Sequence, residues 1–204
     1  MENLNDNKIP SMDELKEAIK IAVRNAVKEL FKINENFYYL VLITTGAADF
    51  LYLSAGSTEG LEKILKQYVE KYGYNPNNPT LKPSLKWSYA DTPYNGFGYE
   101  KYFKDVESLF SLRPQMSDFD DLDLEEDIID EKCSEEYDLR LKAMELALKE
   151  LDEEDVFERK GKRKHLLINV SPDYINTTML LRLNDAEALK EILTDGGPFI
   201  EEEG

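Results

Sequence analysis

The strongest constraint on the fold is the segment from Phe37 to Thr44, which is almost wholly apolar and rich in residues that favour β-structure. Both of its alternating faces are apolar, which is typical of a central strand covered on each side. A short turn over residues 45–49 separates it from a second segment of the same kind, residues 50–55. Two strands this close together predict an antiparallel hairpin.

Helical patterns lie on both sides of this hairpin. Ser11 and Glu14 have the spacing of a capping box, and the apolar residues that follow recur every three to four positions as far as about Lys32. Ser57 is expected to cap a second helix, which Gly73 ends.

The remaining elements are expected in the order helix, helix, strand, helix. Helices are predicted from about residue 99, from about residue 134 and over 185–194, and a strand is predicted over 165–170. Between the second helix and residue 99 we expect loops over 74–83 and 91–98, with a short strand or extended segment over 85–89. Consecutive strands with helices before and after them favour the α+β class. We therefore predict one α+β domain over residues 1–204, with a mainly antiparallel sheet and helices packed on it.

Length and composition limit the compartment and the chemistry. The chain has 204 residues, enough to bury a sizeable core. Its longest apolar run has seven residues, far fewer than the roughly 20 that cross a bilayer. The N-terminal residues are polar and acidic, unlike a signal peptide, and Cys133 has no second cysteine with which to pair. We expect a cytoplasmic protein that does not associate with membranes.

The negative charge is concentrated in one region. The formal net charge is −17, and residues 117–158 hold nineteen acids and four bases, a net charge of −15. Residues 117–131 alone hold nine acids and no base, interspersed with apolar residues such as Phe119 and Leu122, so the pattern leaves open whether this segment is loosely ordered. A surface of this kind repels nucleic acid and attracts basic proteins.

Motifs for catalysis or cofactor binding are missing from the sequence. His165 is the only histidine and Cys133 the only thiol, which leaves almost no ligands for zinc and no partner for a catalytic triad. The acidic run lacks the glycine and the terminal glutamate of a calcium-binding loop, and no glycine pattern matches a phosphate-binding loop. The basic run 159–164 adjoins the acidic region and favours local charge compensation. We therefore expect no metal, no cofactor and no nucleic-acid partner.

Aromatic residues gather in the stretch that is otherwise rich in loop-forming residues. Trp87 and Tyr89 are followed by four more aromatics at positions 94, 97, 99 and 102. Such a group forms either part of the core or a recognition surface, because Trp and Tyr are frequent at the centres of binding interfaces. The sequence leaves both readings open.

Two segments, FYYLVLITTGAADFLYLSAGSTEGL (residues 37–61) and LKWSYADTPY (residues 85–94), carry a family resemblance. In them, and in its order of elements, the chain resembles the bacterial domain-of-unknown-function family 4303. The resemblance implies a helix, an aromatic strand hairpin and a short segment that holds Trp87, but it implies no catalytic residue. Such families are often compared with the immunity proteins of bacterial toxin systems, an analogy at the level of a class.

These observations favour a non-enzymatic binding protein, of the kind that inhibits a basic bacterial toxin. In that hypothesis the carboxylates attract the partner and neighbouring apolar side chains supply the buried contact. The predicted partner-binding residues are Asp118, Phe119, Asp120, Asp121, Leu122, Asp123, Glu125, Glu126, Trp87 and Tyr89. The alternative is an enzyme or small-ligand-binding module with a site near Trp87 and the loops over 74–98, which predicts a concave pocket there.

Overall fold

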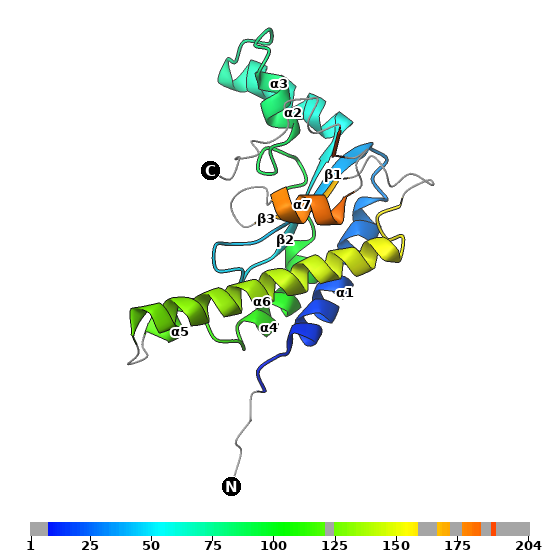
Figure 1. Ribbon diagram of the computed structural model, residues 1–204. Coiled ribbons are helices and arrows are strands. Elements are labelled where there is room, and N and C mark those ends of the chain that lie inside the picture. Colours follow the sequence, from blue (N-terminus) through cyan, green and yellow to red (C-terminus); the bar gives the residue numbers. More distant parts are fainter. Residues whose placement is uncertain (1–7, 121–124, 159–166, 172–176, 185–188, 191–204) are drawn as a thin grey trace.

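The computed structural model describes residues 8–120, 125–158, 167–171, 177–184 and 189–190 (Figure 1). Three strands form one sheet in the order β2-β1-β3. The strands are β1 (Phe37–Ile43), β2 (Tyr52–Ser57) and β3 (Leu167–Ser171). β1 pairs antiparallel with β2, which confirms the hairpin, and parallel with β3, a pairing that the sequence analysis did not specify. With helices before, between and after these strands, the fold belongs to the α+β class.

The helices surround this small sheet. They are α1 (Met12–Leu30), α2 (Thr58–Tyr72), α3 (Leu81–Lys86), a π-helix η1 (Tyr99–Phe103), α4 (Lys104–Phe110), α5 (Met116–Asp120), α6 (Glu126–Glu153) and α7 (Thr177–Leu183). In Figure 1 the long α6 lies across α1 and α4, and its N-terminal end reaches α5 at the edge of the molecule. α2 and α3 form a separate projection at the opposite end of the sheet.

The caps of α1 and α2 confirm the predicted local signals. Ser11 Oγ accepts the backbone N–H of Glu14, whose carboxylate accepts the N–H of Ser11, so the capping box is complete. Ser57 Oγ accepts the N–H of Gly60, and Gly73 ends α2 with φ at +72°. Local sequence therefore determines where both helices begin and end.

Both faces of β1 are buried, against different parts of the fold. Leu40 and Leu42 join the main core, which contains the apolar face of α1, the inner face of α6, Phe103 and Phe110. Val41 and Ile43 point to the other side of the sheet, where they pack with Trp87 and with Leu180 of α7. This arrangement confirms the central strand that the apolar pattern predicts.

The structure corrects two predicted boundaries. Residues 81–86, expected as loop and extended chain, form α3. Pro83 is compatible with this helix because it lies in the first turn, where a backbone N–H has no acceptor within the helix. Leu81 and Leu85 then pack on Leu61 of α2. The helix expected from about residue 134, α6, begins at Glu126 instead. Acids in its first turn favour this earlier start, because they interact favourably with the positive end of the helix dipole.

Candidate functional site

The predicted acidic surface lies at α5 and the N-terminal part of α6. Asp118 is exposed, and its carboxylate accepts the backbone N–H of Gln115 at 2.6 Å. Phe119 is half-buried, Asp120 ends α5, and Glu125 and Glu126 are exposed. Asp121, Leu122 and Asp123, which were also predicted to bind a partner, lie outside the described residues.

The acids along α6 differ in whether they form ion pairs. Over residues 125–135, no ion pair between described residues involves the six exposed acids Glu125, Glu126, Asp127, Asp130, Glu131 and Glu135. From residue 136 onward, four acids each pair with an Arg or Lys from elsewhere in the chain: Glu136, Glu145, Glu150 and Glu154. The exposed Asp138 and Glu153 have no ion pair among the described residues. The acids that pack on the body are therefore compensated, while those of residues 125–135 keep their charge. We call these six residues, with Asp118, the acidic end.

A buried ion-pair network anchors the acidic end to the body. The Arg140 side chain is fully buried and donates to Glu136 at 2.8 Å, to the Ala47 carbonyl at 3.0 Å and to the Pro114 carbonyl at 2.6 Å. Arg113 donates two further hydrogen bonds to Glu136, at 2.7 and 2.6 Å. Burial raises the pKa of Glu136, but the hydrogen bonds from Arg113 and Arg140 outweigh burial and hold this pKa below its usual value.

Trp87 and Tyr89 lie away from the acidic end. Trp87 is 7% exposed, and Tyr89 is half-buried beside it. The backbone around them accepts hydroxyl groups from the sheet: Tyr38 donates to the Lys86 carbonyl at 2.7 Å and Ser54 to the Tyr89 carbonyl at 2.7 Å. Trp87 is the C-cap residue of α3, and Figure 1 shows α3 well away from α5. Trp87 therefore belongs to the core, where it packs with strand β1, and not to the surface that the described acids of α5 and α6 form.

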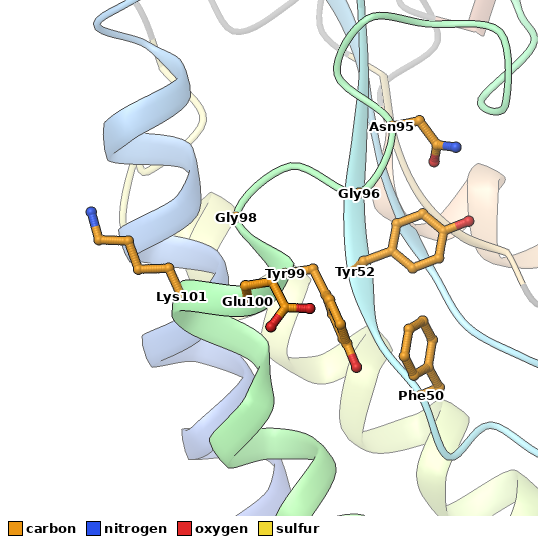
Figure 2. A pocket seen from close by; sticks show the side chains of 8 residues that line it. All are labelled: Phe50, Tyr52, Asn95, Gly96, Gly98, Tyr99, Glu100 and Lys101. Carbon is orange, nitrogen blue, oxygen red and sulfur yellow. The ribbon is translucent and has the colours of Figure 1, made fainter.

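A hollow of about 490 Å³ opens between the start of β2 and η1 (Figure 2). Phe50, Tyr52 and Tyr99 supply aromatic walls, with Asn95 and Glu100 beside them. The centroid of the Phe50 ring lies 4.8 Å from that of Tyr99 and 5.8 Å from that of Tyr52, so the three rings form one continuous wall. The apolar pattern places Phe50 and Tyr52 in a strand but does not reveal this hollow, because the pattern alone does not say which side chains stay uncovered.

Backbone geometry shapes the floor of this hollow. Gly96 and Gly98 have φ values of +72° and +73°, a left-handed conformation that favours glycine. Between them, Phe97 donates its N–H to the Leu53 carbonyl at 2.8 Å, which joins this loop to the edge of β2. The loop therefore covers the sheet edge and holds the floor of the hollow in place.

The charged groups around the hollow are only partly compensated. Lys101 points away from the hollow in Figure 2 and pairs with Glu29 at 2.8 Å. Tyr99 donates its hydroxyl to Glu107 at 2.6 Å, and this carboxylate raises the pKa of Tyr99. The Glu100 side chain is 81% exposed, and its contact with Lys104 is long, at 3.9 Å.

A second, smaller hollow of about 320 Å³ lies between α2 and the loop that leads into α3. Its lining includes Leu65, Val69, Pro76 and Leu81, and is mainly apolar. The two hollows adjoin the beginning and the end of the 74–98 stretch, where the alternative hypothesis places a pocket. Neither includes Trp87 in its lining.

Two other kinds of site, a metal centre and a membrane span, are absent from the part of the chain that the structure describes. No group of three or more His, Cys, Asp or Glu side chains among those residues is arranged to hold a metal ion. None of the helices in the same residues combines the length and the apolar composition that a bilayer span requires.

The comparison with family models places the chain among known sequences. Residues 19–185 match the model described as "Domain of unknown function (DUF4303)", and the chain belongs to this family. The match runs from α1 through α7 and therefore includes the acidic end and the aromatic hollow. No curated protein and no solved structure matches the chain.

Proposed function

We propose that this member of the domain-of-unknown-function family 4303 is a non-enzymatic binding protein whose acidic end captures a basic protein. The observation that carries the proposal is the contrast within α6: acids that pack on the body are paired, whereas the six exposed acids of its N-terminal region have no ion-pair partner among the described residues. An uncompensated surface of one sign attracts partners of the opposite sign and raises their association rate by a factor on the order of 10 to 1,000.

The geometry of the acidic end supports contact as well as attraction. Ile128 is 37% exposed among these acids, and Phe119 and Ile129 are half-buried nearby in sequence. Apolar groups of this kind provide the desolvated contact that slows dissociation, while the surrounding charges act mainly on association. The buried network of Arg113, Glu136 and Arg140 ties this helix to the body, which should limit the entropy that is lost on binding.

We further propose that the basic partner is a toxin domain and that binding inhibits it. Support for this finer assignment is the class analogy between such families and immunity proteins, together with the sign of the charge. An inhibitor of this kind uses its carboxylates to occupy the site where a cationic toxin binds an anionic substrate.

The experiment uses two variants with equal changes of charge. Glu126→Gln, Asp130→Asn and Glu131→Gln together neutralise part of the acidic end, while Glu62→Gln, Asp105→Asn and Glu158→Gln neutralise three exposed acids on other elements. Wild type and both variants are immobilised, exposed to an extract of the source organism at low salt and eluted with rising salt. The partner is then purified and its association rate measured with each protein.

We expect one basic protein to bind wild type and the control variant, and to associate at least tenfold more slowly with the acidic-end variant. Salt should slow its association with wild type much more than with that variant. Equal rates for all three proteins, or no basic partner, would overturn the binding proposal. Binding without loss of the partner's own activity would overturn only the inhibitor assignment.

A further inference from the structure

We infer that the aromatic hollow between β2 and η1 is a binding site for a small organic cation, such as a quaternary ammonium group. This site is separate from the acidic end and does not depend on the proposed capture of a basic protein. Two features of the hollow carry the inference, its aromatic wall and its charge, and a lysine beside the Tyr99 ring supports it.

The wall offers the electron-rich faces that organic cations prefer. Phe50 and Tyr99 are in ring contact at 4.8 Å, and Tyr52 extends the same wall on the side of β2 (Figure 2). The faces of aromatic rings carry negative charge density, and cages of several rings are the usual way in which proteins bind quaternary ammonium groups. With a volume of about 490 Å³, the hollow is of the size that holds small ligands.

The charges that line the hollow favour a cation over an anion. Lys101, the lysine in the lining, is turned outward, where it pairs with Glu29. The carboxylate in the lining, that of Glu100, is exposed and has only the long contact with Lys104. An anion would have to draw Lys101 away from Glu29, whereas a cation meets a carboxylate that is already available.

Lys104 shows that one ring of this wall, Tyr99, interacts with a cation. Its ammonium nitrogen lies 4.6 Å from the centroid of the Tyr99 ring and donates to the Tyr99 hydroxyl at 3.1 Å. The Tyr99 ring therefore attracts a cation, although Lys104 itself is not among the residues that line the hollow.

The experiment compares choline with 3,3-dimethylbutan-1-ol, a neutral molecule of nearly the same shape. Binding to the full chain is followed by NMR through the backbone amides of Gly96 and Gly98, which line the hollow. Choline should shift these amides in a saturable manner, and the neutral analogue should bind at least threefold more weakly, as expected of cation–π contacts at a partly exposed site.

Variants separate this site from unspecific attraction to an acidic protein. Glu100→Gln and Tyr52→Leu should each weaken choline binding by threefold or more. The matched controls, Glu62→Gln and Tyr72→Leu, change the same residue types at exposed positions outside the hollow. They should leave the affinity for choline unchanged. Equal affinity for the two probes, or equal weakening by Glu62→Gln and Glu100→Gln, would overturn the inference. Because Glu100 is exposed, its variant tests the site even if Tyr52→Leu fails to fold.

Discussion

Replacing Glu136 by glutamine should destabilise the protein far more than the same change at any exposed acid of α6. Glu136 accepts three hydrogen bonds from two guanidinium groups, at 2.6, 2.7 and 2.8 Å. The Arg113 and Arg140 side chains are only 9% and 0% exposed, so water cannot replace the lost carboxylate. The substitution leaves two cations buried without a counter-charge.

The size of the effect follows from those contacts. Oε1 of Glu136 accepts two of the three hydrogen bonds and Oε2 accepts one, so a glutamine oxygen in the Oε1 position keeps two and loses the bond from Arg113 Nη2. That one charge-assisted bond costs about 1.5–3 kcal/mol, and the glutamine amide then places a donor against the donor of Arg113. With the counter-charge also lost, we expect a total of roughly 3–5 kcal/mol, the cost of removing one partner from a buried ion pair. This is a large part of the roughly 5–15 kcal/mol by which a domain of this kind is stable.

The assay is equilibrium unfolding in urea, followed through the near-ultraviolet signal of Trp87. Glu131→Gln provides the matched control, since Glu131 lies on the same helix but is exposed, and should change the free energy of unfolding by less than about 0.5 kcal/mol. Adding Arg140→Met to Glu136→Gln removes one of the unpaired cations, so the two losses should combine to less than their sum. A loss below about 1 kcal/mol for Glu136→Gln would refute the reasoning, because it would mean that the network is already solvated.

Two further predictions concern pH and packing. Because the folded protein holds the pKa of Glu136 below its usual value, the stabilisation from this carboxylate is complete above about pH 5 and is lost as the pH falls through the lowered pKa. The difference in urea midpoint between wild type and Glu136→Gln should therefore become smaller below about pH 4. A difference that stays constant with pH would contradict this. Gly56→Ala should cost about 1–3 kcal/mol in the same assay, because a Cβ at Gly56 would overlap the ring of the buried Tyr39; a loss below about 0.5 kcal/mol would show that the ring can move aside.

The two candidate sites differ in how far the sequence could predict them. The acidic end is visible in the sequence, because a run of like charges without bases is a local property, and exposed acids indeed occupy its described part. The aromatic hollow was not predicted, since it requires Phe50 and Tyr52 from one segment and Tyr99 from another to lie side by side. Nor could sequence decide the position of Trp87, because an aromatic residue near loops suits a core and an interface equally well.

Local signals determined the elements whose ends and faces depend on nearby residues. The spacing of apolar residues set the buried face of α1, Ser57 and Gly73 set the ends of α2, and the two-sided apolar pattern set the central position of β1. Each of these signals acts within a few residues, so the chain carries it before any tertiary contact forms.

Tertiary structure alone decided the features that depend on distant partners. From its residue type, Arg140 would be expected at the surface. It is nevertheless fully buried, because Glu136 and two backbone carbonyls from other segments accept hydrogen bonds from its guanidinium group. α3 packs Leu81 and Leu85 on an apolar surface of α2. β3 pairs in parallel with the edge of β1 that lies opposite β2, a contact between segments more than 120 residues apart. A sequence pattern states which groups need partners, whereas only the folded chain determines which partners they meet.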